Sequence, residues 1–402
     1  MSGDAKAAAM PPLLYLFAVT NLVIGTGAFV LSGILLPLSA SLQISVAAAG
    51  QAMTAYALAS AFLAPLLVVA TGQWGRKRAI LFSLFLFAVG TAVCALASTL
   101  PMLLAGRVVM GVGAMFSALA SGVVVALVPP AQRGRALSLS FLGISLSYAV
   151  GVPLGTWLGY AHGWQAPLWL VAGCCLLALA LLAAKVPGQI NAPGASFNGL
   201  ASAARQGVVQ RVWLRTLLYF IAIFSVFAYI GPVLQALNPL TPAQLSFTLV
   251  MFGLSGVVGT ILGGWATDHF GPLRSQRVML FMLVLMMALV PLTRGHYALC
   301  VVVFVAWGVA GFGLMAPQQS MLAHAAPQQA PLLMSLNASM LYGGTALGAV
   351  ISGSFISTLG FERLAWVGLP FALLALLTLW FDAHAHTESP PRCSTPMNWI
   401  RS

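Results

Sequence analysis

The sequence predicts an all-α integral membrane protein whose twelve transmembrane helices form two pseudo-symmetric six-helix bundles. Of its 402 residues, 60% are hydrophobic and only 5% are charged, whereas a soluble domain carries about 25% charged residues. The apolar residues lie in continuous runs, unlike the alternating strands of about ten residues that build a transmembrane barrel. A soluble enzyme, a nucleic-acid-binding protein and a disordered chain are therefore excluded.

Twelve apolar runs are long enough to cross the bilayer, which takes about 20 residues per helix. The first run is longer than a typical signal-peptide core, and only Lys6 precedes it as a basic residue, so we expect it to remain attached. The runs lie near 13–36, 47–71, 79–98, 102–128, 136–160, 167–184, 216–237, 244–267, 278–293, 297–322, 332–359 and 364–382.

The distribution of Lys and Arg predicts the orientation of these spans, because basic residues accumulate in cytoplasmic loops. With the amino terminus inside, 14 of the 17 Lys and Arg fall in the terminal segments or in inside loops. Only Arg294 and Arg363 fall outside, and Arg107 lies within a span. We therefore expect a multi-pass protein of the bacterial inner membrane with both termini in the cytoplasm.

A polar segment at 185–215, rich in Gly, Pro, Asn and Ser and then in basic residues, divides the chain into two halves. It predicts an N-terminal bundle at 1–184, a cytoplasmic linker at 185–215, a C-terminal bundle at 216–382 and a tail at 383–402. The halves also repeat a motif, since Gly75 after the second span corresponds to Gly271 after the eighth. Paired six-span repeats are typical of transporters whose bundles rock about a central site.

Four stretches of the chain carry a resemblance to a known family. Together with the twelve-span pattern, they make the chain resemble a transporter of the major facilitator superfamily, within its bacterial drug and sugar efflux branch of arabinose-efflux-like permeases. The stretches are GRKR at 75–78, LAGRVVMGVG at 104–113, GVPLGTWLG at 151–159 and GTGAFV at 25–30.

The resemblance implies a secondary active transporter that exports a small organic compound, drug-like, sugar or metabolite, by alternating access linked to protons. It implies a monomer in the lipid bilayer that binds a small-molecule substrate, with no cofactor, metal, nucleic acid or catalytic residue. A membrane enzyme would need His, Asp, Glu or Cys clustered at one depth, and the sequence shows no such cluster. A receptor would usually add an output domain, whereas the predicted tails are short.

The antiporter-like stretch in the fifth span places small residues on one helix face. Gly151, Gly155 and Gly159 recur every four residues, which lets another helix approach closely, and Pro153 favours a kink. Two interpretations stay open: a tight static contact, or, as the resemblance implies, an interface that slides between the inward and outward states.

The loop after the second span holds Gly75 and three consecutive cations, Arg76, Lys77 and Arg78. The resemblance implies an acidic residue three positions before the glycine, which would latch one conformation. Gly72 stands there in the first half, whereas the second half keeps the acid as Asp268, ahead of Gly271. The three cations then act mainly in orientation.

Carboxylates are scarce, and this bears on coupling. The five acidic residues fall outside the predicted spans or at their ends, and they are Asp4, Asp268, Glu362, Asp382 and Glu388. Proton-coupled transporters commonly use an intramembrane acid. The resemblance implies one in the first span, at the position where this chain has Ala28. The alternative function is therefore an uncoupled facilitator of a neutral or anionic solute.

Arg107 is the only charge predicted well inside a span, and the resemblance implies that it faces the cavity and takes part in coupling. A lipid-facing position would cost a few kcal/mol, less with snorkelling, and snorkelling to the headgroups is the alternative. Other polar and aromatic residues could line the same cavity, although each alone is more typical of helix packing. They are Asn21, Thr26, Tyr148, Tyr219, Phe224, Tyr229, Trp307, Gln318, Gln319, Asn337 and Tyr342.

Overall fold

The computed structural model describes residues 11–71, 73–129, 132–188, 204–325 and 330–387. Throughout these ranges the regular structure is helical, and twelve stretches are long and apolar enough to cross a membrane. The predicted all-α fold and the predicted number of spans are therefore confirmed.

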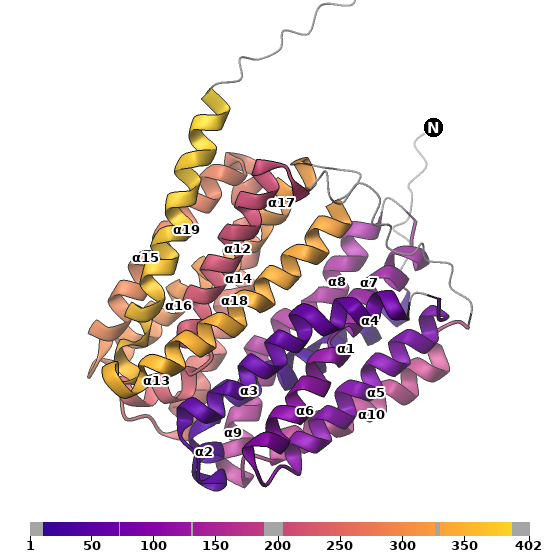
Figure 1. Ribbon diagram of the computed structural model, residues 1–402, viewed down its shortest axis with the longest axis horizontal. Helices are drawn as coiled ribbons and strands as arrows, with labels where there is room; N and C mark the ends of the chain where they lie inside the picture. Colours follow the sequence, from indigo (N-terminus) through magenta and orange to yellow (C-terminus); the bar gives the residue numbers. More distant parts are fainter. Residues whose placement is uncertain (1–10, 72, 130–131, 189–203, 326–329, 388–402) are drawn as a thin grey trace, which may run out of the picture.

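The chain forms two bundles of six spans that lie side by side (Figure 1). The N-terminal bundle contains α1 (Pro12–Phe29), α2 (Leu35–Leu42), α3 (Val46–Leu58), α4 (Ala64–Ala70), α5 (Arg76–Ala95), α6 (Leu100–Gly113), α7 (Phe116–Leu127), α8 (Arg133–Leu146), α9 (Val152–His162) and α10 (Ala166–Lys185). The C-terminal bundle contains α12 (Gly207–Phe227), α13 (Ile230–Leu237), α14 (Pro242–Phe270), α15 (Pro272–Leu289), α16 (Tyr297–Gly313), α17 (Met315–Ala325), α18 (Ala330–Leu359) and α19 (Leu364–Thr387).

The first, fourth, seventh and tenth spans are broken into two helices each. The first span passes from α1 through the 3₁₀ turn η1 (Val30–Gly33) into α2, and the seventh passes from α12 into α13. Aligning Phe29 with Phe227 also aligns Gly33 with Gly231, so the two breaks are equivalent. The second and fifth spans contain π-helical turns instead, η2 (Ala59–Leu63) and η4 (Ser147–Gly151).

The seventh span differs from the prediction. It was expected at 216–237, but α12 begins at Gly207 and the membrane-length helix ends at Phe227. The last part of the expected linker is therefore helical, and Arg215 lies inside the span rather than before it. At the other end of the chain, α19 continues to Thr387, a few residues into the expected tail.

The bundles meet along two seams, α3 against α18 and the η4–α9 segment against α14, while α13 packs against η1 and α2 between them. These contacts run from one end of the molecule to its middle. We call this end, which holds α2, α9 and α13, the closed end; in Figure 1 it lies at the bottom. Toward the opposite end, the contacts between the bundles extend to η2 against α18 and to α8 against α14.

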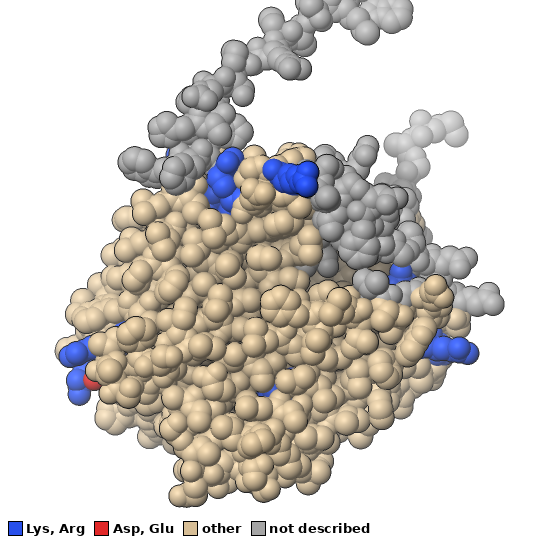
Figure 2. Space-filling model, viewed as in Figure 1, with Lys and Arg blue, Asp and Glu red and all other residues tan. Residues whose placement is uncertain are grey.

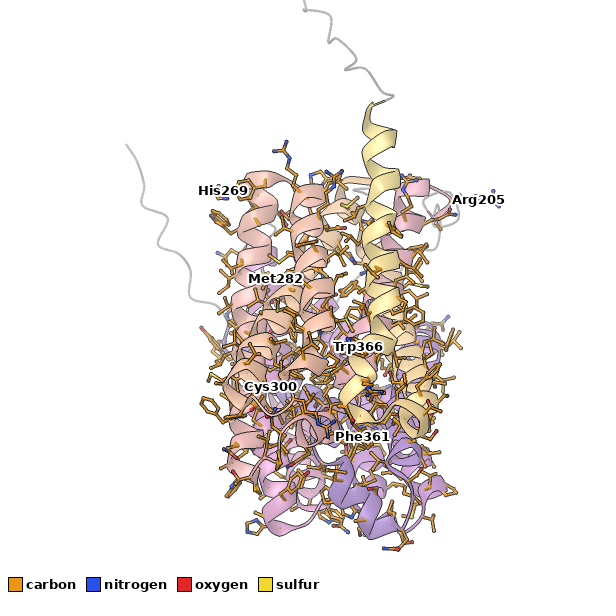
Figure 3. The ribbon with its side chains drawn as sticks, turned by 90° about the vertical axis from the view of Figure 1, so that its left-hand side faces the viewer. Arg205, His269, Met282, Cys300, Phe361 and Trp366 are labelled. Atoms are coloured by element: carbon orange, nitrogen blue, oxygen red, sulfur yellow. The ribbon has the colours of Figure 1, made fainter. Side chains whose placement is uncertain are left out.

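Apart from Arg107 and Arg215, which are buried inside the bundles, the charged residues lie toward the margins of the molecule. On the face shown in Figure 2 the broad flank is nearly free of Lys, Arg, Asp and Glu, as a lipid-facing surface requires. In the C-terminal bundle, Arg205 and His269 lie at the end opposite the closed end, and Phe361 lies toward the closed end (Figure 3). Arg294, which pairs with Glu362 at 3.6 Å, is also at the closed end.

Candidate transport site

An aromatic cluster joins the two bundles. Phe29 of α1 stacks on Tyr148 of η4, with ring centroids 4.9 Å apart. Both rings contact the C-terminal bundle, because Phe29 lies 6.0 Å from Phe227 and Tyr148 lies 5.1 Å from Phe312. The structure thus brings the predicted residue Tyr148 to the bundle interface. The cluster consists of Phe29, Tyr148, Phe224, Phe227, Phe252, Trp307 and Phe312.

Trp307, another predicted residue, forms the rear of this cluster within the C-terminal bundle. Its ring packs 5.1 Å from Phe252 and 5.5 Å from Phe304, and the side chain is buried. Among the described residues its indole N–H has no hydrogen-bond acceptor. Buried indole N–H groups usually find a partner, so this donor is one that a bound molecule could satisfy.

A second contact between the bundles involves Tyr342 of α18. Its ring meets Tyr56 of α3 edge to face, with centroids 6.3 Å apart. The guanidinium carbon of Arg107 lies 4.6 Å from the centroid of the same Tyr56 ring, within the range of a cation–π contact. Tyr56 therefore links Arg107 to the other bundle.

Arg107 is fully buried, and backbone carbonyls compensate its charge. Its Nε donates to the carbonyl of Ala52 at 3.0 Å, and its two terminal nitrogens donate to Gly27 at 2.9 Å and Ala28 at 2.6 Å. Gly27 and Ala28 lie in the last turn of α1, where carbonyls lack helical partners and carry the negative end of the helix dipole. The side chain does not snorkel; its donors are used within the N-terminal bundle.

Asn21 and Thr26, both predicted to line the cavity, lie inside the N-terminal bundle. Asn21 donates to the Ser140 carbonyl at 2.9 Å and accepts from the Ser117 hydroxyl at 2.7 Å, which connects the first, fourth and fifth spans. Thr26 donates to the Leu22 carbonyl of its own helix and packs against Gly151. In this conformation both side chains serve helix packing.

Two predicted residues, Gln318 and Asn337, meet in the C-terminal bundle around Thr216, which was not among the residues predicted from the sequence. The Thr216 hydroxyl of α12 contacts the side-chain oxygens of Gln318 on α17 and of Asn337 on α18, the latter at 2.7 Å. One turn along α12, the Tyr219 hydroxyl donates to the thioether sulfur of Met315 at 3.7 Å. Phe224 joins the aromatic cluster, and the Tyr229 hydroxyl donates to the Ala349 carbonyl at 3.0 Å. Gln319 is exposed.

Arg215 is a buried charge that the sequence reading missed. It is fully buried, and it donates to Gln276 at 2.6 Å and to the Thr378 hydroxyl at 2.9 Å. The prediction that Arg107 is the only charge well inside a span is therefore wrong. The available signal was the apolar helical pattern at Val208, Val209 and Val212, which extends the span to include Arg215.

The glycine stripe of the fifth span packs within its own bundle. A Cβ atom on Gly151 would lie 1.8 Å from the Thr26 hydroxyl, and one on Gly155 would lie 2.4 Å from Val30. Gly159 similarly faces Ile34. The stripe thus fits α8–α9 closely onto the first span. Pro153 is turned toward the other bundle, where its carbonyl accepts a 3.0 Å hydrogen bond from Ser246 of α14.

The loop motifs lie at the ends of helices opposite the closed end. Gly75 precedes α5, whose first turn holds Arg76, Lys77 and Arg78. Gly271 joins α14 to α15 with φ of 80°, a conformation that favours glycine. Asp268 is exposed in the last turn of α14, and Gly72 lies outside the described residues. The proposed latch therefore stays a prediction.

Comparison with known proteins matches the chain over nearly its whole length. The sequence profile described as Major Facilitator Superfamily matches residues 17–330 and 212–397. The inner membrane transport protein YdhP of Escherichia coli (strain K12) is 31% identical over 382 residues, covering 94% of this chain and 97% of that protein. A chloramphenicol resistance protein of Streptomyces lividans is 30% identical over 392 residues, covering 95% and 99%.

A solved structure shares the fold. The bacterial homolog of the human lysosomal transporter Spinster, in an inward-facing and occupied conformation, superposes with a TM-score of 0.77. The match covers 94% of this chain and 98% of that one at 14% sequence identity.

Proposed function

This chain belongs to the Major Facilitator Superfamily, and we propose that it exports a small organic compound across the bacterial inner membrane by alternating access. The aromatic cluster carries the proposal. It draws rings from both bundles, between which a substrate would be held while the bundles rock about it.

The conformation described here is proposed to be inward-facing. The bundles meet at the closed end, whereas the loops richest in Lys and Arg lie at the opposite end. Basic loops mark the cytoplasmic side, so the end opposite the closed end would open to the cytoplasm with both termini there. Export then requires the closed end to separate after a solute has bound from the cytoplasm.

The composition of the cluster supports an amphiphilic aromatic substrate, neutral or anionic. Its walls are mainly aromatic rings, with the Trp307 N–H as an available donor. A cationic solute would need a buried acid nearby. Of the carboxylates in the described ranges, Asp268 and Glu362 lie at helix ends, and Asp382 lies in the last two turns of α19, past the apolar span that ends at Leu379. The relative named as a chloramphenicol resistance protein fits a neutral aromatic solute.

An uncoupled facilitator is the second candidate, and the surroundings of Arg107 favour it. In the family pattern an acid stands where this chain has Ala28, and here Arg107 binds the Ala28 carbonyl instead. Backbone carbonyls already compensate the charge of Arg107. Among the described residues, its hydrogen-bond partners include no carboxylate that could accept a proton.

Everted membrane vesicles test the function directly. We would measure uptake of chloramphenicol, the anion salicylate and the cation ethidium, with and without an imposed pH gradient. The export proposal expects uptake of chloramphenicol or salicylate and little uptake of ethidium. Failure of all three solutes to exceed empty-vector vesicles would contradict this substrate class, and uptake that needs no gradient would favour the facilitator.

A further inference from the structure

We propose that Thr216, Gln318 and Asn337 form a subsite that binds a neutral hydrogen-bonding group of the substrate, an alcohol or an amide. The proposal rests on the proposed transport function and adds to it the chemistry of the group recognised by the C-terminal bundle. The three side chains come from the seventh, tenth and eleventh spans, and each is at least nine-tenths buried.

The hydrogen bonds of this triad are incomplete. The single Thr216 proton faces three acceptors, namely the Val212 carbonyl, Gln318 and Asn337, so it can satisfy only one of them at a time. The Gln318 amide nitrogen has no partner among the described residues. Rotating that amide would let its nitrogen donate to Thr216, but its oxygen would then lose its contact. In either orientation one buried amide atom stays unpaired.

The N-terminal bundle provides an internal comparison. Its first, fourth and fifth spans correspond to the seventh, tenth and eleventh, and they also carry a polar triad: Asn21, Ser117 and Ser140. There the amide is used at both ends, because its nitrogen donates to Ser140 and its oxygen accepts from Ser117. Corresponding spans thus hold a closed network in one bundle and an open one in the other.

An unpaired buried polar group is costly, so it needs a water, an ion or a ligand as partner. The triad is not sealed, because Asn337 keeps 7% of its surface exposed. One turn away, the Tyr219 hydroxyl has only a thioether as its acceptor, and sulfur is a weak one. Donors and acceptors lie together here on uncharged side chains, which suits an alcohol or an amide.

Substitution of Gln318 tests the subsite. Gln318→Met keeps the length of the side chain and removes the amide, while Ser117→Ala opens the corresponding network of the other bundle. We would measure chloramphenicol binding by isothermal titration in detergent, because this neutral aromatic compound carries hydroxyl and amide groups. We expect Gln318→Met to weaken binding about tenfold, the scale of one buried hydrogen bond. Ser117→Ala should leave the dissociation constant unchanged.

The melting temperature separates a ligand from a structural water. If a ligand fills the open position, Gln318→Met melts at or above the wild-type temperature without solute, because an unpaired amide has been removed. A lower melting temperature with unchanged chloramphenicol affinity would assign the position to a bound water and overturn the subsite. Absence of chloramphenicol binding to the wild type would also overturn it, whereas uptake of salicylate would leave the transport function standing. Thr216→Val, which removes the hydroxyl, should weaken binding in the same way.

Discussion

At the residue scale, Arg107 shows how a charge is accommodated in the membrane without an acid beside it. Its three nitrogens bind carbonyls of the first and second spans, and two of these carbonyls belong to the last turn of α1. The break after Phe29 is what frees them, since a continuous helix would use its own carbonyls. The arginine therefore fixes three spans of the N-terminal bundle around the kink of the first.

Removing the Arg107 side chain should lower the stability of the N-terminal bundle and should also reduce transport. Arg107→Ala leaves three buried carbonyls without their donor, and we expect a loss on the order of 3 kcal/mol. The measurement is the melting temperature in detergent, with Arg294→Ala, which removes an exposed cation, as the control. If Arg107→Ala melts like the wild type but no longer transports, the arginine acts on substrate or coupling rather than on packing.

Sequence reasoning identified Arg107 but could not identify its partners. The carbonyls of Gly27 and Ala28 lie 80 and 79 positions away in the chain, and backbone acceptors carry no residue signature. Arg215 was missed for a related reason. A charge beside an apolar run was read as the end of the run, whereas Gln276 and Thr378 from two other spans satisfy it inside the membrane.

At the element scale, the glycines fall into two groups according to what they face. Gly143, Gly151 and Gly155 face the first span of their own bundle. Gly231 and Gly253 face the opposite bundle, where added Cβ atoms would lie 2.6 Å from the Gly33 carbonyl oxygen and 2.3 Å from the Ala149 Cα. The sequence pattern shows that small residues recur. Only the fold distinguishes a contact within one bundle, which persists during transport, from a contact between bundles, which must separate.

A methyl group on Gly253 should prevent closure without disturbing either bundle. In Gly253→Ala the new atom meets the backbone of η4, so we expect the closed end to be held apart and transport to be largely lost. The matched control is Gly264→Ala on the same helix, where a Cβ atom meets nothing within 4 Å. Folding should be near normal in both, because the atoms nearest the added methyl group of Gly253→Ala belong to the other bundle and that of Gly264→Ala meets nothing within 4 Å.

Cysteine labelling detects this opening. With the five native cysteines replaced, a cysteine at Gln51 reports on the seam where Gln51 lies near Gly353 of the other bundle. It should react with an impermeant maleimide from the closed-end side in Gly253→Ala and be protected in Gly264→Ala. Equal protection in both variants would show that the Gly253 contact does not set the conformation.

A methyl group within a bundle should act on folding instead. The Cβ atom of Gly143→Ala would lie 1.8 Å from the Ala18 carbonyl oxygen, and both residues belong to the N-terminal bundle. No rocking motion relieves that contact, so we expect a lower melting temperature and reduced expression. Gly122→Ala, at an open position of α7, is the control. Normal stability of Gly143→Ala with blocked transport would instead support a sliding interface in the fifth span.

At the scale of the whole molecule, composition and charge distribution predicted the membrane location and the twelve spans. They could not predict the breaks in the first, fourth, seventh and tenth spans, because interior glycines are common in unbroken membrane helices as well. Those breaks determine which side chains meet between the two bundles. They turn Phe29 and Phe227 toward each other across the pseudo-symmetry axis and bring Gly33 next to Gly231 at the closed end.

Coupling is also a property of the whole molecule, because a transported proton needs a carrier that both sides of the membrane can reach. The carboxylates in the described ranges lie toward the two ends of the molecule: Asp268 in the last turn of α14, Asp382 in the last two turns of α19, and Glu362, which pairs with Arg294, at the closed end. His324 is exposed at the end of α17. The centre instead contains aromatic rings and a cation compensated by carbonyls.

We therefore expect transport to depend only weakly on a proton gradient. In everted vesicles, collapsing an imposed pH gradient with nigericin should change the initial rate of chloramphenicol uptake by less than about twofold, because a gradient acts on transport only through a group that binds protons differently in the two conformations. A strict requirement for the gradient would contradict this expectation and direct the search for the carrier to the residues at the helix ends.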